Sequence, residues 1–371
     1  MRILVLNAGS SSLKFNLFEA RPDVEERLEK GEVERVSSMA DAIATMFDRL
    51  GVDPVDAVGH RVVHGGDRFH ESVIIDEEVE KAIDELSALA PLHNPHNLEA
   101  YRAAREHLPG ATHVAVFDTA FHRTLPPRSY AYGLPWEFLT QKKIRRYGFH
   151  GISHRYVSWR FAQLHGKTRA DYRMITCHLG NGCSVCAIDH GKSIDTSMGF
   201  TPLEGLIMGT RSGDVDAGAI LHLITNECIA PSLLLRALNS ASGLKGISGV
   251  SNDMRDLLRE AGRGHERARL AVDAFCYRVR KYIGAYLAAM NGADALIFAG
   301  GIGENSAAIR AGICEGMDGL GIAIDRSANE SESHEPREIG SSPIKVWVVP
   351  TDEELLIARD TMRCILQIPH E

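Results

Sequence analysis

The chain begins with Ile3-Leu4-Val5-Leu6, which is followed at once by Asn7-Ala8-Gly9-Ser10-Ser11-Ser12-Leu13-Lys14-Phe15. Four apolar residues in a row predict a buried β-strand, and the small polar residues after them predict a turn. Beyond the turn, Leu13, Phe15 and Leu17 alternate with polar residues, which is the pattern of a second strand. We therefore expect a β-hairpin whose tip carries an amide, hydroxyl groups and a lysine.

The tip of this hairpin has the chemistry of an anion site. Backbone N–H groups and hydroxyls that converge on one point bind phosphate oxygens, and Lys14 adds positive charge. The Gly-x-x-x-x-Gly-Lys pattern of a Walker loop is absent, and we expect no helix after the turn. Serine-rich turns also serve as plain connections, so this hairpin alone predicts either a phosphate site or a structural turn.

A second stretch, from Met174 to Ile188, repeats the pattern of strand, small polar turn and strand. Aligning His178-Leu179-Gly180 with Asn7-Ala8-Gly9 places a polar residue at the strand end and a glycine two residues later in both copies. Two such hairpins in one chain predict two related lobes that bind one nucleotide. This arrangement is similar to that of actin, sugar kinases and heat-shock chaperones.

Composition narrows the class of protein. With 371 residues the chain has room for two domains. The net charge of -8 argues against a nucleic-acid or anionic-membrane partner. No apolar run approaches the ~20 residues of a membrane span, and the N-terminus lacks a signal-peptide pattern. Seven cysteines without regular spacing fit reduced thiols, so we expect a cytoplasmic protein.

Cys183 and Cys186 match the C-x-x-C pattern, but they fall on a predicted strand. Residues three apart on a strand point to opposite faces, which argues against shared metal binding.

The rest of the chain alternates between helical and strand patterns. We expect the segment from Arg21 to Arg35 to be a solvated connector, the segment from Asp195 to Gly218 to be a long polar loop, and the lobe boundary to lie near Phe121. Helices are expected at Met39–Leu50, after Asp76, up to about Leu108, from Ser153, over His265–Met290 and from Glu353. Strands are expected at Val58–His64, Val114–Phe117, Ala295–Phe298 and Val346–Val349.

Several polar residues follow buried strands or lie within them. Arg61 lies among valines, and a buried arginine needs an anionic partner. This partner is either a carboxylate of the protein, in a structural ion pair, or a bound ligand. Asp118 follows a strand, where ligands of α/β folds bind, although a turn or helix cap also explains it. His150, Arg211 and the Gly300–Asn305 turn have similar structural alternatives. Together they place many polar groups at strand ends, which favours a binding site.

Nine separated segments resemble the acetokinase family of the actin-like ATPase superfamily. They are Asn7–Lys14, His60–Gly66, Leu89–Pro95, Val116–His122, Tyr147–His154, Cys177–Gly182, Asp195–Asp214, Gly300–Ser306 and Pro350–Leu355. The resemblance implies a two-lobed α/β fold of the actin-like ATPase (ribonuclease H-like) type, in which each lobe is a mixed sheet flanked by helices and the lobes are duplicates. It implies an N-terminal lobe from residues 1–120 plus 354–371 and a C-terminal nucleotide-binding lobe from residues 121–353.

The resemblance also implies a reaction. Members of the family transfer the γ-phosphoryl group of ATP to acetate, giving acetyl phosphate and ADP, reversibly and by direct in-line transfer. Magnesium is the expected cofactor, with Mn²⁺ as a substitute, and a homodimer is the expected assembly. A loose phosphoryl-transfer transition state is stabilised mainly by positioning and by cations. We therefore expect the lobes to close before the chemical step.

Site residues are carried over position by position. The resemblance assigns phosphoryl transfer to Arg61, Asp118, His150 and Arg211, and metal binding to Asn7 and Glu353. Acetate would contact Arg61, Val63, Leu92, His93, Phe149 and Pro202. The nucleotide would contact Ser10, Ser12, Lys14, His178, Leu179, Gly180, Asn181, Gly182, Asp253, Met254, Arg255, Gly301, Ile302, Gly303, Glu304 and Asn305.

Two other classes share these hairpins. A sugar or polyol kinase would use Asp118 as a base on a hydroxyl group, and a nucleotide-gated binding protein would need no arginines for an acceptor. The pair Arg61 and Arg211 suits a carboxylate acceptor better than either. The chain departs from the family in a shorter segment before Ala57, in Ala217 where proline is usual, and at the variable position of Met254.

Overall fold

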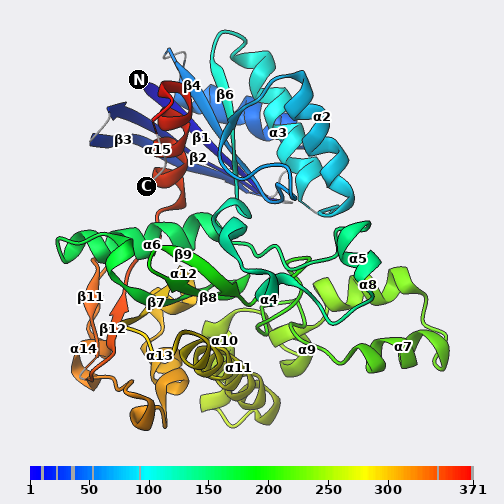
Figure 1. The fold of residues 1–371 in the computed structure, drawn as a ribbon, viewed down its shortest axis with the longest axis vertical. Helices are drawn as coiled ribbons and strands as arrows, with labels where there is room; N and C mark the ends of the chain where they lie inside the picture. Colours follow the sequence, from blue (N-terminus) through cyan, green and yellow to red (C-terminus); the bar gives the residue numbers. More distant parts are fainter. Residues whose placement is uncertain are drawn as a thin grey trace. The chain divides into compact units, whose positions relative to one another are not determined.

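The computed structural model describes residues 1–9, 12–21, 24–34, 38–51, 54–91, 93–340 and 342–368. The chain divides into two compact units. Unit 1 comprises Met1–Arg123, Phe149–Tyr156 and Asp352–Glu371, and unit 2 comprises Thr124–Gly148 and Val157–Thr351. Each unit contains one six-stranded mixed sheet with helices packed against it (Figure 1).

The sheet of unit 1 has the strand order β3-β2-β1-β4-β6-β5. Its strands are β1 (Arg2–Ala8), β2 (Ser12–Arg21), β3 (Val24–Glu34), β4 (Ala57–Val62), β5 (Val73–Ile74) and β6 (Thr112–Phe117). Strands β1, β4 and β6 run parallel, whereas β2 and β3 extend one side antiparallel and β5 closes the other. The predicted first hairpin is confirmed, and Asn7 pairs with Lys14 next to the turn.

The prediction of a solvated connector from Arg21 to Arg35 is wrong, because Val24–Glu34 forms the edge strand β3. Its sequence shows no apolar alternation, since most of its side chains are exposed and charged. The strand forms through backbone pairing with β2 along the whole of β3. Charged side chains on an edge strand also oppose pairing with another molecule.

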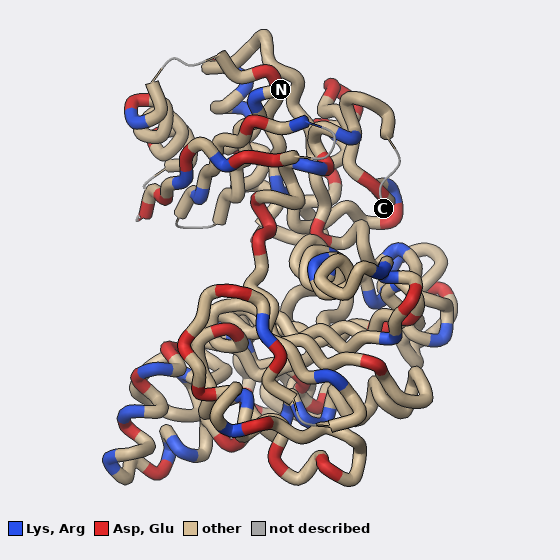
Figure 2. The backbone as a smooth tube through the Cα atoms, turned by 90° about the vertical axis from the view of Figure 1, so that its left-hand side faces the viewer, with Lys and Arg blue, Asp and Glu red and all other residues tan. Residues whose placement is uncertain are grey.

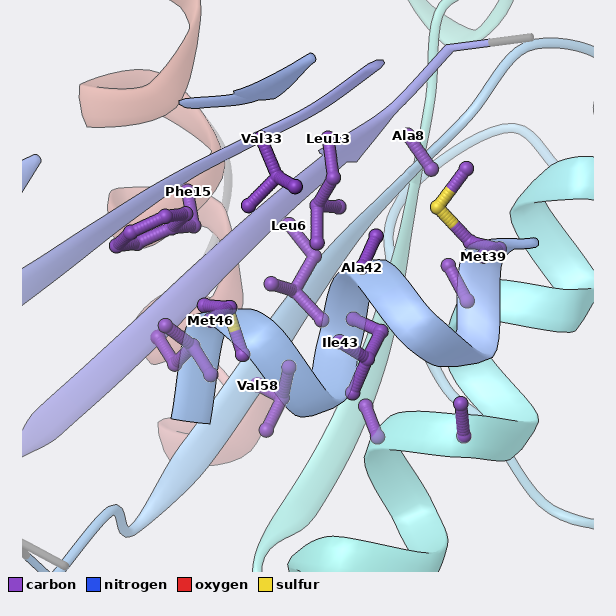
Figure 3. Close-up of a cluster of buried hydrophobic side chains, with 14 of the residues drawn as sticks. Leu6, Ala8, Leu13, Phe15, Val33, Met39, Ala42, Ile43, Met46 and Val58 are labelled. Atoms are coloured by element: carbon purple, nitrogen blue, oxygen red, sulfur yellow. The ribbon is translucent and has the colours of Figure 1, made fainter. Parts of the chain in front are cut away.

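The core of unit 1 lies between the sheet and the helices α1 (Met39–Leu50) and α3 (Asn94–His107). The side chains of Met39, Ile43 and Met46 point from α1 toward Leu6 and the neighbouring strands (Figure 3). All four of these side chains are at most 3% exposed. Ser38 caps α1 by accepting a hydrogen bond from the Asp41 N–H, so the predicted helix begins where a capping residue allows it.

The helix α15 (Glu353–Leu366) covers the opposite face of the same sheet. It packs on β4 at Gly59, where an added Cβ would lie 2.3 Å from Oγ1 of Thr361. Val58, the preceding residue, belongs to the cluster on the α1 face, and successive strand residues point to opposite faces. Glycine is therefore required at position 59 for the helix to approach the sheet.

A pair of histidines lies within the core of unit 1. Nε2 of His60 lies 2.9 Å from Nδ1 of His113 on the neighbouring strand, and Nε2 of His113 faces the Leu108 carbonyl at 3.3 Å. The ring of Tyr101 packs edge-on against both, and Arg105 lies near His113. Burial and then the charge of His113 lower the pKa of His60 well below its usual value. Burial likewise lowers the pKa of His113.

The sheet of unit 2 has the strand order β11-β12-β10-β7-β8-β9. Its strands are β7 (Arg173–Leu179), β8 (Cys183–Asp189), β9 (Lys192–Thr196), β10 (Ala295–Ala299), β11 (Arg337–Glu338) and β12 (Lys345–Val348). Strands β7, β10 and β12 are parallel and the other three are antiparallel to their neighbours. This order and these directions repeat those of unit 1 strand by strand, as expected for a duplicated fold.

The helices of unit 2 cover this sheet and extend beyond it. The long helix α11 (Glu266–Met290) packs against β7 and β8, and His265 caps it, close to the predicted limits. The other helices of the chain are α2 (Glu77–Glu85), α4 (Pro127–Tyr130), α5 (Trp136–Thr140), α6 (Gly151–Leu164), α7 (Ala217–Thr225), α8 (Pro231–Ser240), α9 (Gly243–Ser248), α10 (Met254–Gly262), α12 (Gly300–Asn305), α13 (Ala307–Cys314) and α14 (Arg326–Glu330).

Charges are distributed along the whole chain. Basic and acidic residues are interspersed along the backbone of both units (Figure 2). Within the described ranges, no helix combines the length and the apolar character that crossing a membrane requires.

Candidate functional site

An ion pair lies at the carboxyl ends of two parallel strands in unit 1. Arg61 belongs to β4, and Asp118 directly follows β6. Oδ2 of Asp118 accepts hydrogen bonds from Nε of Arg61 at 3.1 Å and from Nη2 at 2.5 Å. The Asp118 side chain is 1% exposed, whereas that of Arg61 is 19% exposed. The buried carboxylate therefore holds one edge of the guanidinium group in place.

Asn7 and the start of α15 complete this polar cluster. Oδ1 of Asn7 accepts a hydrogen bond from Nη1 of Arg61, and its Nδ2 donates to Oε1 of Glu354, both at 3.1 Å. Burial, the largest cause, and the charge of Asp118 raise the pKa of Glu353, whereas Arg61 lowers it; the resulting pKa is about 7. Burial lowers the pKa of Arg61, but the nearby carboxylates raise it above its ordinary value. Sequence reasoning missed Glu354. The signal that could have found it is its position directly after Glu353, the predicted metal ligand.

The chemistry of this cluster fits a magnesium ion. Oδ1 of Asp118 is buried and has no hydrogen-bond partner among the described residues. Three carboxylates, those of Asp118, Glu353 and Glu354, act electrostatically on this cluster together with Arg61. In the described part of the chain, no group of three or more His, Cys, Asp or Glu side chains could hold a metal alone. Magnesium often uses one or two carboxylates together with water and phosphate oxygens, so this ligand set is sufficient.

His150 is placed by contacts with the backbone of Asp118. The N–H of Gly151, the first residue of α6, donates to the Asp118 carbonyl at 3.0 Å, and a Cβ at Gly151 would lie 2.2 Å from that oxygen. A ring nitrogen of His122 lies 3.0 Å from the Phe149 carbonyl. Between these anchors, His150 has a φ of +55°, which costs about 1 kcal/mol or more for a residue with a side chain. Such strain often accompanies a functional side chain.

Two apolar residues predicted for the acetate pocket, Val63 and Phe149, have buried side chains. Val63, two residues after Arg61, is 6% exposed, and Phe149 is 1% exposed. The backbone N–H of Val63 donates to Oδ1 of Asn97 at 3.1 Å, which fixes the end of β4 against α3. The other residues predicted for the acetate pocket are His93, half-buried before α3, Pro202, which lies in unit 2, and Leu92, which lies outside the described residues.

Unit 2 contains a cavity of about 540 Å³ formed by three segments. These are the turn after β7, the start of α10, and α12 with the start of α13. The lining residues that were predicted for the nucleotide are Gly180, Asn181, Asp253, Met254, Arg255, Gly301, Ile302 and Asn305. The lining residues that sequence reasoning missed are Asn252, Leu258 and Ser306, each of which is close in sequence to a predicted one.

Several residues predicted for the nucleotide lie elsewhere. His178 and Leu179 end β7, Gly182 closes the turn by accepting the Gly180 N–H at 3.1 Å, and Gly303 and Glu304 lie in α12; none of these is among the cavity-lining residues. Ser12 and Lys14 begin β2 in unit 1, where Lys14 is exposed, and Ser10 lies outside the described residues.

The loop that carries Arg211 is attached to the same hairpin turn. The N–H of Gly209 donates to the Asn181 carbonyl at 3.0 Å. Nη1 of Arg211 donates to the Pro202 carbonyl at 2.7 Å, which links two residues predicted for the site. The loop is shorter than the predicted range from Asp195 to Gly218, because Asp195 belongs to strand β9 and Ala217 is the first residue of helix α7.

A partly buried hydrogen-bond network that includes residues of this loop was not predicted. Arg146 donates to the carbonyls of Thr196, Ser197 and Met198 and to Oε1 of Glu204 at 2.6 Å. Glu204 also accepts a hydrogen bond from the Tyr132 hydroxyl. Burial and the Glu204 charge raise the pKa of Tyr132. These partners are 50 or more residues apart in sequence, so no local motif marks them.

Comparisons with known proteins identify the family to which the chain belongs. The model described as the Acetokinase family matches residues 30–359. Acetate kinase from Thermotoga maritima is 48% identical over 401 aligned positions, which cover 99% of this chain and 100% of that protein. Acetate kinase from Solibacter usitatus is 48% identical over 415 positions, covering 100% of both chains.

Two solved structures resemble the whole chain. The crystal structure of acetate kinase from Porphyromonas gingivalis has 42% identity and a TM-score of 0.90, covering 98% of this chain and 99% of that one. A propionate kinase from Francisella tularensis has 39% identity and a TM-score of 0.91 at the same coverage. The predicted fold class, a duplicated two-lobed actin-like ATPase fold, is confirmed. Because the family model matches most of the chain and curated relatives share nearly half of its residues over full length, the chain belongs to the acetokinase family.

Proposed function

We propose that this protein is an acetate kinase, which transfers the γ-phosphoryl group of ATP to acetate and forms acetyl phosphate and ADP reversibly by direct in-line attack. The observation that supports this most is the Arg61–Asp118 pair at the strand ends, with the buried Val63 two residues away. A guanidinium group held by a carboxylate suits a small carboxylate substrate, because its free donors can bind the acetate oxygens. The identity to acetate kinases over full length supports the same conclusion.

The cavity of unit 2 is the proposed nucleotide site. Its glycine-rich segments at Gly180 and Gly301 allow close approach of the backbone to a ligand, and the amide of Asn305 adds a polar contact. Arg211 would contribute positive charge to the transferred phosphoryl group, since its loop is hydrogen-bonded to the turn that lines this cavity. His150 is the other residue to which we assign stabilisation of the transferred phosphoryl group. Phosphoryl transfer depends mainly on such positioning and charge stabilisation.

Asn7 and Glu353 would hold a magnesium ion, with Asn7 acting through water, and Mn²⁺ would serve in its place. The chemistry that the ion supplies is neutralisation of negative charge on phosphate oxygens. Asp118 would orient Arg61 and, through its free Oδ1, a water molecule in the same cluster.

Acetate is the proposed substrate in preference to propionate. Val63 and Phe149 are buried and bulky, which favours a small pocket for the methyl group. Such pockets distinguish one methylene by roughly 1–3 kcal/mol, so the preference would be partial rather than absolute. Propionate is the second candidate, because the chain is about as similar to a propionate kinase structure as to an acetate kinase structure.

Trapping the product with hydroxylamine tests the proposal. The protein is incubated with ATP, magnesium, hydroxylamine and acetate, propionate or glycerol in parallel. An acyl phosphate yields a hydroxamate, whereas a sugar or polyol phosphate does not. We expect hydroxamate with acetate, less with propionate, and ADP release that depends on the acid. Phosphorylation of glycerol without hydroxamate from either acid would contradict the proposal.

A homodimer is the proposed assembly. The helix α7 is rich in alanine, leucine and isoleucine, and none of its residues, all of which the structure describes, is buried. Leu221 on α7 is 60% exposed, Leu235 on α8 is 56% exposed and Trp136 on α5 is 72% exposed. Exposed apolar surface of this kind usually marks a protein contact. The same surface in a second copy would cover it.

Sedimentation of purified protein tests this assembly. The wild type should sediment as a dimer, and Leu221→Glu should shift it toward the monomer. Leu270→Glu, on α11 at a residue that is 58% exposed, is the matched control and should leave the dimer intact. A monomeric wild type would contradict the proposal.

The cytoplasm is the proposed location. All seven cysteines are free, and most of them are buried. Free thiols are stable in a reducing compartment, where ATP is also available.

A further inference from the structure

Glu304 lies in the glycine-rich helix α12, but its side chain does not join the residues that line the nucleotide cavity. Its Oε1 instead accepts two backbone hydrogen bonds, from the Gly300 N–H at 2.8 Å and from the Thr351 N–H at 3.0 Å. Burial raises the pKa of Glu304, and these two hydrogen bonds oppose the rise. A single carboxylate oxygen of Glu304 thus connects Gly300 to Thr351, and Thr351 lies 47 residues beyond Glu304.

The first donor, Gly300, begins α12 (Gly300–Asn305), which we call the nucleotide turn because three of its residues line the cavity. Gly300 has a φ of +75°, and a Cβ there would lie 2.8 Å from the Leu179 carbonyl. The backbone of Gly300 therefore packs directly on the end of β7, next to the turn at Gly180. Fixing the Gly300 N–H fixes the start of the segment that contributes Gly301, Ile302 and Asn305 to the cavity lining.

The second donor belongs to the segment that leads into α15. The pairing of β10 with β12 ends near the hydrogen bond from the Val349 N–H to the Phe298 carbonyl at 3.0 Å. The Glu304 contact continues this connection to Thr351, beyond the end of the strand. Thr351 is the last residue of unit 2, and Glu353, the proposed metal ligand, follows two residues later.

The backbone of Glu304 is itself held in place. Arg310, only 1% exposed, donates from Nη1 to the carbonyls of Gly303 and Glu304, each at 2.9 Å. Its Nε donates to Oδ1 of Asn329 at 2.7 Å. These hydrogen bonds fix the backbone position of Glu304, so its side chain is held where it accepts the Thr351 N–H.

We propose that Glu304 is a positioning residue that couples the nucleotide turn to the segment carrying Glu353, so that nucleotide binding and magnesium binding strengthen each other. This inference rests on the proposed function only for the roles of the two segments. A residue that merely contacted the nucleotide would change nucleotide affinity alone. A coupling residue changes how much magnesium improves that affinity, because linkage between two ligands is reciprocal.

Calorimetric titration of ADP, with and without magnesium, tests the coupling directly and needs no turnover. The measured quantity is the ratio of the two dissociation constants. Glu304→Gln keeps an acceptor oxygen at the position that receives both N–H groups, and we expect a ratio within about twofold of wild type. Glu304→Ala removes the acceptor and should weaken binding with magnesium by about tenfold, given that hydrogen bonds to charged groups are strong. Binding without magnesium should weaken much less.

Two further variants keep the test decisive. Glu304→Asp retains the charge but is shorter by one methylene, so it should lose coupling even if Glu304→Ala does not fold. Glu315→Ala removes a glutamate whose side chain is 82% exposed, and it should behave as wild type. Equal weakening of ADP binding with and without magnesium in both Glu304→Ala and Glu304→Asp would overturn the proposal. So would a loss of coupling in Glu304→Gln as large as in Glu304→Ala.

The outcome is separate from that of the proposed function. A wild type that shows magnesium-dependent ADP binding but yields no hydroxamate would refute acetate phosphorylation and leave the coupling intact. A wild type that makes hydroxamate but binds ADP equally with and without magnesium would refute the coupling.

Discussion

The substitution Asp118→Asn tests what the buried carboxylate contributes to the reaction. Acetate resembles a glutamate side chain, whose pKa is about 4.3, so well over 99% of it is ionised at pH 7. Because the acetate nucleophile carries no proton, the reaction does not require a general base to remove one. The structure instead shows Oδ2 of Asp118 accepting two hydrogen bonds from Arg61. We therefore expect Asp118 to act by orienting the guanidinium group.

The size of the effect follows from this contact. Removing one preorganised group that stabilises charge in the transition state costs about 2.7–4 kcal/mol. The Arg61 side chain is 19% exposed and also contacts Asn7, so we expect the lower end of that range. A loss of about 3 kcal/mol in transition-state stabilisation corresponds to a fall of roughly 100-fold in kcat/KM for acetate.

The assay measures hydroxamate formation by Asp118→Asn with added azide or formate over a range of pH. We expect no recovery, together with an altered dependence on magnesium. Asp76→Asn is the matched control, because Asp76 caps α2 on the surface and asparagine caps helices equally well. Recovery that increases with the pKa of the added base would refute the reasoning and assign Asp118 the role of a general base.

Three other predictions concern the pocket, the two arginines and the pH dependence of stability. Val63→Ala should narrow the difference in kcat/KM between acetate and propionate by enlarging the pocket, and unchanged ratios would remove Val63 from it. Arg61→Ala should mainly raise the KM for acetate, whereas Arg211→Ala should lower kcat by a factor on the order of 10³. If Arg211→Ala changed only KM, Arg211 would not stabilise the transition state. The pKa of His60 is lowered by burial and then by His113, so the unfolded chain binds the proton more tightly and stability is lost as the pH falls below about 6.5. In urea unfolding at pH 5.5 and 7.5, His60→Gln should lose less stability on acidification than wild type, and equal losses would show that the pair does not control acid sensitivity.

Periodicity and capping residues were enough to predict most of the fold. The buried run at Ile3–Leu6 and the polar turn after it gave the first hairpin, and Asp76 marked the start of α2 as its cap. The strand β3 was not predicted, because hydrogen bonds between its backbone and that of β2 stabilise it. Such pairing does not require apolar residues to alternate with polar ones in a charged, exposed segment. The duplication was visible from the two hairpin motifs, since each repeats the same local pattern.

The site was predictable only in part. Most of the site residues came from the family resemblance, because short motifs such as Gly300–Asn305 have structural alternatives. Contacts between distant segments left no local signal. The Arg61–Asp118 pair joins residues 57 positions apart, and the orientation of Glu304 toward Thr351 depends on the alignment of β10 with β12. Such contacts follow from the three-dimensional fold rather than from residue spacing.

The position of α15 determines the order in which the chain can fold during synthesis. The strands of unit 1 from β1 to β6 leave the ribosome before α15, whose residues Ile357 and Thr361 cover the face of β4 at Gly59. All of unit 2 is synthesised before that helix. The nascent sheet of unit 1 therefore exposes an apolar face until α15 has been synthesised, and nascent chains with such surfaces are the ones that chaperones protect from aggregation.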